Sequence, residues 1–181
     1  MAGPLIAFTG QMDYPPNVEA VTAFARDVFP LIRKARPDTH FAIVGRNPAD
    51  EVKRLGQGGN VIVTGAVADI RSWLAAADVV VAPLRIARGV QNKVLEAMAL
   101  ACPVVASPAA FEGIEAKPGR DLIVADGAVA QAEAVLTLLD PAIAQEIGRA
   151  ARARMMKAYH WEAQLAPLTD LVSAARRWAA A

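Results

Sequence analysis

Cysteine and histidine are scarce in this sequence, and their scarcity excludes several classes of site. The single cysteine, Cys102, cannot form a disulfide framework or a thiolate zinc site. The two histidines, His40 and His160, lie far apart in no ligand spacing, so we expect no metal site. The G-x-G-x-x-G sequence of dinucleotide dehydrogenases and the Walker phosphate loop are also missing, which argues against these two nucleotide-binding classes.

Charged residues and long apolar runs are limited as well. The net charge is +1 and no long basic stripe occurs, so we expect no nucleic acid as a partner. No apolar run approaches the ~20 residues of a membrane-spanning helix, and the start MAGPLIAFTG lacks the basic flank of a signal peptide. We therefore expect a cytoplasmic location. The hydrophobic fraction of 55% and the mean hydropathy of +0.29 are high, which predicts an apolar surface against a partner subunit or a further domain.

Short apolar runs alternate with helical patterns along most of the chain. These runs are rich in valine and isoleucine and apolar at nearly every position, as parallel strands covered on both faces are. The predicted strands are Leu5–Thr9, His40–Val44, Val61–Thr64, Asp78–Ala82, Pro103–Ala106 and Leu122–Ala125. The alternation predicts an α/β fold, a Rossmann-like, doubly wound, mainly parallel six-stranded sheet with C-terminal helices.

Apolar residues recur at helical spacing in the connections and after the last strand. In the first connection they run from Val18 to Leu31, with Asn17 as the predicted N-cap and Pro30 as a kink or restart. The other predicted helices are Ala49–Leu55, Ile70–Ala77, Lys93–Ala101, Ala128–Leu139, Pro141–Lys157 and Trp161–Ala181.

The predicted caps and the absence of a linker complete the organisation. Asp69, Asn92 and Asp126 are the predicted N-caps of three of these helices. No internal repeat or low-complexity linker occurs, so residues 1–181 are predicted to form a single domain. The tail 160–181 is predicted to pack on this domain or to extend toward a second one.

The carboxyl ends of the strands are where a ligand is expected. In an open parallel sheet, ligands bind beyond these ends, near the point where the strand order reverses. Gly10, Gly45 and Gly65 each follow a predicted strand directly. Glycine there permits a tight exit and a close approach by a ligand, although it is also a common turn residue.

The stretch RGVQNKVLEAMA, residues 88–99, combines a helix start with charge. If Asn92 caps the helix, the unpaired backbone N–H groups and the positive end of the helix dipole favour an anion. Arg88 and Lys93 would add positive charge, and Gly89 would let a phosphate approach the backbone. Glu96 could accept hydrogen bonds from two neighbouring hydroxyls. A carboxylate for a ribose diol beside cations for a diphosphate describes a nucleoside diphosphate site.

A simpler alternative stays open for this helix. Lys93 and Glu96 could form an i,i+3 ion pair on a solvated face, worth ~0.2–0.5 kcal/mol. In both cases one broad face is predicted to pack inward, formed by Val94, Leu95, Ala97, Met98, Ala101 and Cys102.

Nearly the whole chain resembles the C-terminal, donor-binding half of GT-B glycosyltransferases of the family-4, or group 1, type. The resemblance rests on FTGQMDYPPN, FAIVG, VIVTGAVADIRSWLAAADVVVAPL, KVLEAMALACPVVAS and DLIVAD. Its most specific part is E-A-M-A followed by P-V-V-A, at its spacing after the A-D-V-V-V-A-P strand. More narrowly, RGVQNKVLEAMA resembles bacterial sugar transferases of exopolysaccharide assembly.

The resemblance implies roles for several loop residues. Glu96 would be the second glutamate of the family's E-x7-E motif, which holds the nucleotide ribose. The loop at Gly10 and Gln11 and the amides around Gly89 and Val90 would hold the diphosphate. Two further residues would lie near the base: Val67, through its backbone, and Arg46, which could also reach a phosphate.

Two departures from the family pattern concern charge. Arg88 stands where the first glutamate of E-x7-E is expected, which leaves the donor sugar and the stereochemical outcome open. The family's Arg/Lys pair after the first strand is missing, because GQMDYPPN contains no cation. Lys93 and Arg88 are predicted to replace that charge.

The implied reaction moves a sugar from a nucleoside diphosphate sugar to an acceptor hydroxyl, in exopolysaccharide or glycoconjugate synthesis. No cofactor or metal is expected, since no D-x-D motif occurs. Catalytic residues are expected in an N-terminal acceptor domain outside this chain, which could also bind the inner face of the plasma membrane. The chain alone is expected to be inactive. The alternatives are half of a nucleotide-sugar epimerase, with Glu112 and Glu115 as candidate acid–base residues, and a non-catalytic sugar-nucleotide-binding module.

Overall fold

A parallel sheet forms the centre of the molecule. The structure is a computed structural model, and it describes residues 3–160 and Leu165. The strands are β1 (Leu5–Thr9), β2 (His40–Val44), β3 (Val61–Gly65), β4 (Val79–Ala82), β5 (Val104–Ala106) and β6 (Ile123–Val124). They form one six-stranded sheet in the order β3-β2-β1-β4-β5-β6, and every neighbouring pair is parallel. The predicted α/β class is therefore confirmed, and the predicted strands agree with these bounds to within one residue at each end.

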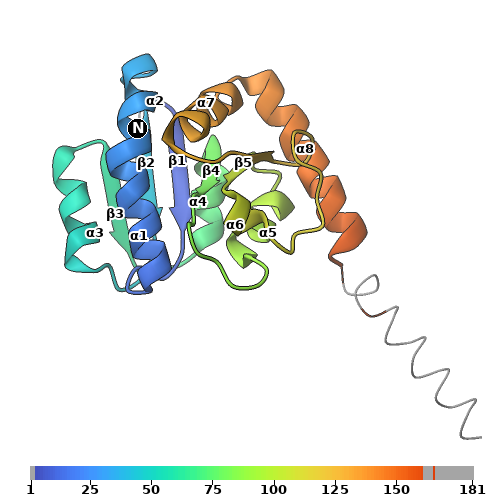
Figure 1. Cartoon of the computed structure of the whole chain (residues 1–181), viewed down its shortest axis with the longest axis horizontal. Helices are drawn as coiled ribbons and strands as arrows, with labels where there is room; N and C mark the ends of the chain where they lie inside the picture. Colours follow the sequence, from blue (N-terminus) through green and yellow to red (C-terminus); the bar gives the residue numbers. More distant parts are fainter. Residues whose placement is uncertain (1–2, 161–164, 166–181) are drawn as a thin grey trace, which may run out of the picture.

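Helices fill the connections between the strands (Figure 1). They are α1 (Pro15–Ala23), the π-helix η1 (Phe24–Val28), α2 (Phe29–Ala35), α3 (Asp50–Leu55), the 3-10 helix η2 (Gly56–Gly58), α4 (Ile70–Ala76), α5 (Asn92–Ala99), α6 (Pro108–Phe111), α7 (Ala128–Leu138) and α8 (Pro141–Ala158). In Figure 1, α1 and α7 lie in front of the sheet and α4 lies behind it. Helix α5 packs against β4 and β5, and α8 packs against both α5 and α7.

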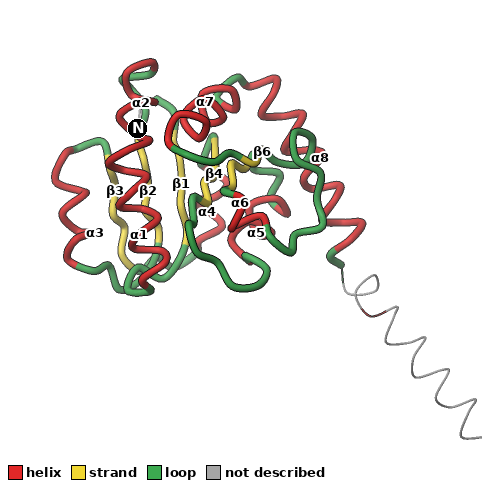
Figure 2. Tube along the Cα trace, viewed as in Figure 1, coloured by secondary structure: helices red, strands yellow, loops and turns green. Residues whose placement is uncertain are grey.

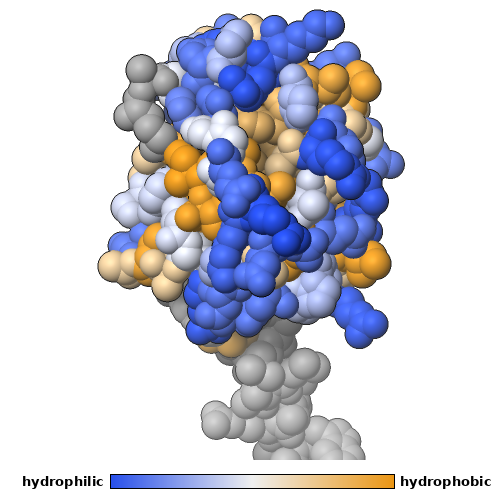
Figure 3. Space-filling view, turned by 90° about the vertical axis from the view of Figure 1, so that its left-hand side faces the viewer, coloured by the Kyte–Doolittle hydropathy of each residue, from blue (hydrophilic) through white to orange (hydrophobic). Residues whose placement is uncertain are grey.

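The central strands are buried on both faces, which explains their unbroken apolar sequences. Every residue of β1, β4 and β5 is buried, whereas the edge strands β3 and β6 are half-buried throughout. Helix α3 packs beside the β3 edge and carries charged side chains. Figure 3 views this side of the molecule, where hydrophilic residues cover the middle of the surface and hydrophobic patches flank it.

Three of the four predicted N-caps are wrong. Helix α1 begins at Pro15 with Tyr14 as its N-cap, because proline is preorganised for the first helical turn; Asn17 therefore lies inside the helix. Helix α5 begins at Asn92 itself, after Gln91 as the N-cap. Gly127, with a φ of 78°, replaces Asp126 as the residue before α7. The fourth prediction is confirmed, because Asp69 accepts a hydrogen bond from the backbone N–H of Arg71.

Two prolines lie in the first turn of a helix, Pro30 in α2 and Pro108 in α6. The predicted restart at Pro30 is confirmed, since the π-helix η1 precedes it and α2 follows. The short helix α6, which begins at Pro108, was not among the predicted helices. Ser107 caps α6 by accepting a hydrogen bond from the backbone N–H of Ala110.

The C-terminal helices follow the prediction as far as the structure describes them. Helix α8 begins at Pro141 and is capped by Asp140, whose carboxylate accepts from the backbone N–H groups of Ala142 and Ile143. The predicted helix over 161–181 lies outside the described residues, apart from Leu165. Within the described part of the chain, no helix is both long and apolar enough to cross a membrane.

Candidate functional site

The strand order reverses between β1 and β4, and three loops meet near that point. They are residues 10–14 after β1, residues 45–49 after β2 and residues 83–91 before α5. Figure 2 shows the long loop before α5 at the same end of the molecule as the loop that precedes α1. The sequence therefore places the candidate residues at the edge of the sheet where open parallel sheets bind ligands.

The loops after β1 and β2 are joined by hydrogen bonds. The backbone N–H of Met12 donates to the carbonyl oxygen of Arg46 at 2.9 Å, and the N–H of Ala49 donates to Met12 at 3.0 Å. The Arg46 guanidinium donates to Oε1 of Gln11 at 3.1 Å. A Cβ at position 45 would collide with the carbonyl oxygen of Gly10, so Gly45 is required for this close approach. The structure thus brings Gly10, Gln11 and Arg46 together, as predicted.

Lys93 projects from α5 toward the start of α1. Its ammonium donates to Oδ1 of Asn17 at 2.6 Å and lies 4.2 Å from the centroid of the Phe8 ring, in a cation–π contact. Asn17 is itself buried, and its Nδ2 donates to the carbonyl oxygen of Gln11 at 2.9 Å. One asparagine therefore fixes both the lysine and the loop after β1.

Partial burial changes the acid–base property of this lysine. Desolvation lowers the pKa of Lys93 from 10.5 to about 8, although the nearby Glu96 carboxylate acts in the opposite direction. Lys93 therefore remains mainly protonated at pH 7 but is held in an environment that disfavours its charge. An anion bound beside it would supply the missing compensation.

The alternative ion pair on the solvated face of α5 is not formed. The Lys93 ammonium is directed to Asn17, and no salt bridge joins it to Glu96 in the described part of the chain. Glu96 is exposed. The inward face of α5 is confirmed for Val94, Ala97 and Met98, which are fully buried. Leu95 is half-buried, and Ala101, also half-buried, lies beyond the helix with a φ of 59°.

The start of α5 offers unpaired backbone donors. Within residues 3–160, the backbone N–H groups of residues 89–93 donate no hydrogen bond to a protein acceptor. Gly89 has a φ of 65°, and its carbonyl oxygen accepts from Nε2 of Gln91 at 3.0 Å, which stabilises this turn. Successive free amides at a helix N-terminus form a typical anion-binding arrangement.

Three other predicted residues lie apart from the Lys93 and Asn17 group. Arg88 is exposed in the loop before α5, and no hydrogen bond or ion pair of its side chain is found in the described residues. Val90 is 43% exposed and lies against Gly113, which follows α6. Val67 is half-buried and packs on a small apolar cluster that contains Leu5 and Val44.

Sequence reasoning missed Asn17 as a site residue and assigned it to helix capping. The sequence feature that could have indicated a site role is the position of Asn17 in the first turn of the helix after the first strand, seven residues after Gly10. Its partner, Lys93, lies 76 residues away, so only the tertiary fold reveals the contact. Among the described residues, no three His, Cys, Asp or Glu side chains are grouped as metal ligands would be.

The fold matches that of GT-B glycosyltransferases. The family described as "Glycosyl transferases group 1" matches residues 3–141, and the chain belongs to this family. The predicted resemblance is therefore confirmed at the level of the family. No curated protein sequence matches the chain.

Solved structures of similar fold include proteins from several bacteria. Sucrose-phosphate synthase (tll1590) from Thermosynechococcus elongatus is 24% identical with a TM-score of 0.73, over 96% of this chain and 46% of that one. Alr3699/HepE from Anabaena, in complex with UDP, is 18% identical with a TM-score of 0.73, over 95% of this chain and 49% of that one. The C-terminal domain of a group 1 glycosyl transferase family protein (LpcC) from Francisella tularensis is 21% identical with a TM-score of 0.70, and 87% of each chain is covered. The chain thus spans less than half the length of the first two proteins and most of the isolated C-terminal domain.

Proposed function

We propose that this chain is the donor-binding half of a glycosyltransferase that moves a sugar from a nucleoside diphosphate sugar to an acceptor hydroxyl. The proposed pathway is the synthesis of exopolysaccharide or another glycoconjugate, at the cytoplasmic face of the membrane. The observation that carries the proposal is the Lys93 ammonium, held by Asn17 beside the free amides of residues 89–93. A nucleoside diphosphate is the ligand whose charge matches this group.

The proposed chemistry depends on stabilising a leaving group. Transfer of the sugar builds negative charge on the departing diphosphate while an oxocarbenium-like centre forms at the sugar. The Lys93 cation and the amides at the start of α5 are fixed before the reaction, so they would stabilise that charge without reorganisation. These groups can act without a resident cofactor.

The remaining candidate residues would hold the nucleoside. Glu96, exposed one turn into α5, would accept hydrogen bonds from the two ribose hydroxyls. The backbone at Val67 would border the base, and Arg46 would lie near the base or a phosphate. A micromolar ligand requires about 8 kcal/mol of binding free energy, and one charged hydrogen bond contributes ~1.5–3 kcal/mol. Several of these groups must therefore act together.

The proposed enzyme also needs an acceptor domain. The similar full-length proteins are more than twice as long as the part that this chain matches, which supports a second domain that would carry the acceptor site and the catalytic residues. We therefore propose that the chain alone binds the nucleotide but transfers no sugar. Transfer of glucose from UDP-glucose to an acceptor by the isolated chain would contradict the proposal that the chain alone is inactive.

The epimerase alternative receives no support from its candidate residues. Glu115 pairs with Arg154 of α8 at 3.3 Å, and its backbone N–H donates to the Tyr159 hydroxyl. These contacts connect the loop to the end of α8, which is a structural role. Glu112 is exposed at the end of α6.

Calorimetric titration of the chain with UDP, GDP, ADP and their sugars tests the proposal and identifies the base. We expect one base to bind best, and Glu96→Gln to weaken it roughly 10- to 100-fold. Glu133→Gln, an exposed carboxylate on α7, is the matched control and should leave binding unchanged. Absence of binding by every nucleotide, or equal affinity for the Glu96 variant, would refute the assignment.

A further inference from the structure

Apart from the candidate donor site, a cleft lies between η1, α7 and the carboxyl ends of β4 and β5. Its volume is about 480 Å³, within the range of small-molecule sites. Its lining comprises Ala23, Phe24, Asp27, Val28, Pro83, Leu84, Arg85, Ser107, Pro108, Ala109, Asp126, Gly127, Ala128 and Gln131. None of these is a candidate donor-site residue. The cleft begins about 9 Å along the first helix from Asn17, at ~1.5 Å per residue.

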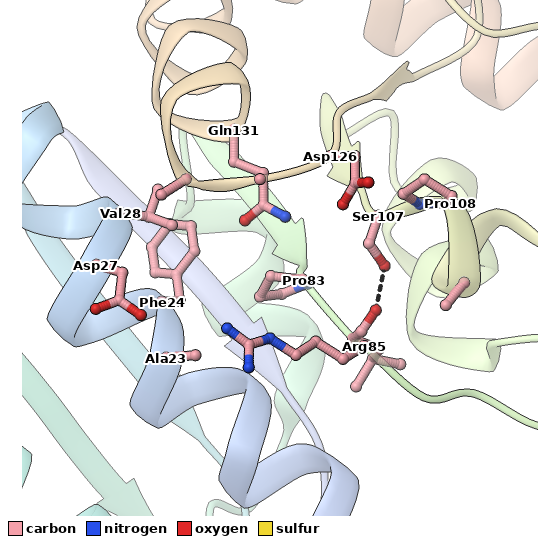
Figure 4. Close-up of a pocket in the computed structure, with 14 residues that line it drawn as sticks. Ala23, Phe24, Asp27, Val28, Pro83, Arg85, Ser107, Pro108, Asp126 and Gln131 are labelled. Atoms are coloured by element: carbon pink, nitrogen blue, oxygen red, sulfur yellow. Dashed lines mark hydrogen bonds between the residues drawn. The ribbon is translucent and has the colours of Figure 1, made fainter.

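Gln131 directs a buried amide into this cleft (Figure 4). The residue is only 8% exposed and lies on α7 beside buried Ala132 and Val135. Its Nε2 reaches the carbonyl oxygen of Ala125 at 3.5 Å, the limit of a hydrogen bond, and its Oε1 accepts no hydrogen bond within the described residues. The amide therefore has hydrogen-bonding capacity to offer a ligand in the cleft.

Charged groups face the same space from two sides. Asp126 is exposed at the rim, and its carboxylate has no hydrogen bond or ion pair within residues 3–160. Arg85 extends from the end of β4 toward η1 in Figure 4, and its nearest ionic partner, Glu19, is 3.6 Å away. Asp27 is already held by Arg26 at 2.7 Å. The available polar groups are therefore a carboxylate, an amide and a guanidinium.

The floor of the cleft is apolar and fixed in place. The π-helix η1, a wide turn that often marks functional sites, contributes Phe24, Asp27 and Val28. At the end of β5, the Ser107 hydroxyl donates to the carbonyl oxygen of Leu84, so the strand ends on this side are tied together. Phe24 is only 1% exposed, so it closes the floor of the cleft, and a ligand would contact mainly the polar side chains above it.

We propose that this cleft binds a neutral pyranose unit, separately from the nucleotide. Sugar hydroxyls would hydrogen-bond with Asp126, Gln131 and Arg85, and the C–H groups of the ring would contact the small apolar side chains of the lining. Asp27 is paired with Arg26 and Arg85 lies near Glu19, so the unpaired charge in the lining is the Asp126 carboxylate, which disfavours an anionic sugar. The inference rests on the proposed function only in identifying the source of the sugar, a glycan acceptor or product.

Backbone amide shifts in ¹H–¹⁵N NMR test this with methyl α-D-glucopyranoside as the probe, in the presence of saturating UDP. UDP occupies the nucleotide part of the proposed donor site, so the position of the shifts shows whether the sugar binds beside the nucleotide or in the cleft at Gln131. We expect saturable shifts for residues 84, 85 and 126–131 as the sugar is raised to about 50 mM, a concentration above the millimolar dissociation constant of a weak site. D-glucuronate should bind at least about fivefold more weakly, because of the Asp126 carboxylate in the lining.

Variants separate recognition from structure. Gln131→Leu, which retains the side-chain volume, and Asp126→Asn should each weaken sugar binding at least about fivefold, the loss of one hydrogen bond. Both should leave UDP affinity unchanged, and Glu133→Gln, on the outer side of α7, should leave both affinities unchanged. Absence of shifts, shifts confined to the loops at Gly10 and Gly89, or equal sugar affinity in both cleft variants would overturn the inference. UDP binding in the same samples reports separately on the proposed donor site.

Discussion

The Lys93 ammonium lies 2.6 Å from Oδ1 of Asn17, across the point where the strand order reverses. The two residues are 76 positions apart, one in the first helix after β1 and the other at the start of α5. The loop after β1 contains no cation of its own. The contact therefore delivers a positive charge to that loop from a different element of the fold.

Removing this charge should weaken nucleotide binding more than removing Arg88. Lys93→Met retains the apolar stem but eliminates the ammonium, so we expect a roughly 10- to 100-fold loss in affinity for the preferred nucleoside diphosphate. Arg88 is exposed and unpaired within the described residues, and Arg88→Ala should cost less than about threefold, as exposed charges generally do. Calorimetry on both variants checks the order. A larger loss for Arg88→Ala would assign the charge to the loop instead.

Exchanging the two residues should preserve the charge at the same place. In the double variant Asn17→Lys, Lys93→Asn, the ammonium would start from α1 and the amide from α5, and their contact could form again. We expect the exchange to recover most of the affinity lost by Lys93→Asn alone. Equal affinity of the double and single variants would mean that the direction of the lysine, rather than its charge, is essential.

Nucleotide affinity should also fall as the pH rises through the pKa of Lys93. Desolvation lowers this pKa to about 8 in the free protein, and an anion binds the protonated form. Above this pH, binding requires uptake of a proton, so affinity should decrease by up to about tenfold per pH unit. Calorimetric titrations between about pH 7 and 9.5 measure the slope. Lys93→Met supplies the control, because its weaker binding should lack this dependence.

The lowered pKa of Lys93 also predicts that folding stability rises with pH, whereas nucleotide affinity falls. The unfolded chain, with the ordinary lysine pKa of 10.5, binds more protons than the folded chain between about pH 8 and 10.5. The contribution of Lys93 to folding stability therefore rises with pH across this window, by roughly 3 kcal/mol at most. Denaturant unfolding of the parent chain and of Lys93→Met should show a difference in stability that shrinks toward pH 10. A difference that is constant with pH would be inconsistent with the lowered pKa.

The sheet could be predicted closely from the sequence because its strands are buried on both faces. A short, continuous apolar run such as Leu5–Thr9 is typical of a parallel strand buried on both faces, so the predicted bounds agree with the structure. Helix starts were harder to predict. Helix α1 begins at Pro15, two residues before the predicted cap Asn17, and Gly127 rather than Asp126 precedes α7.

The candidate site could be predicted only in part. Strand-end glycines and the helix start at Gly89 to Lys93 predicted that these residues lie at one edge of the sheet, because parallel strands bring their ends together. The direction of the Lys93 side chain and the role of Asn17 depend on the packing of α5 against α1, which no local pattern encodes. The cleft at Gln131 also depends on the π-helix and on how α7 returns over the sheet.

Asp121 should be a stability determinant at neutral pH. Burial alone would raise its pKa, but hydrogen bonds from Arg120 and from the backbone N–H of Lys117, together with the charge of Arg154, lower the pKa below 3.8. A carboxyl with a lowered pKa in the folded state adds stability above its unfolded pKa and loses it as the pH falls through the folded value. We expect Asp121→Asn to cost about 2–3 kcal/mol at pH 7, measured by denaturant unfolding. The cost should shrink as the pH falls below the ordinary aspartate pKa of 3.8; a cost independent of pH would assign it to packing instead of charge.

Gly148 should reverse the usual helix preference for alanine. It lies inside α8, where glycine is ordinarily about 1 kcal/mol less favourable than alanine. A Cβ at this position would collide with the carbonyl oxygen of Ala101, where α8 crosses the turn between α5 and β5. Because both partners are backbone, the helix must move away to admit the methyl group, so we expect Gly148→Ala to destabilise the fold by ~1–3 kcal/mol. Ala153→Gly, at an exposed position of the same helix, should cost about 1 kcal/mol through propensity alone. Thermal unfolding of both variants distinguishes the effects: stabilisation by Gly148→Ala would show that α8 does not pack this closely on the turn.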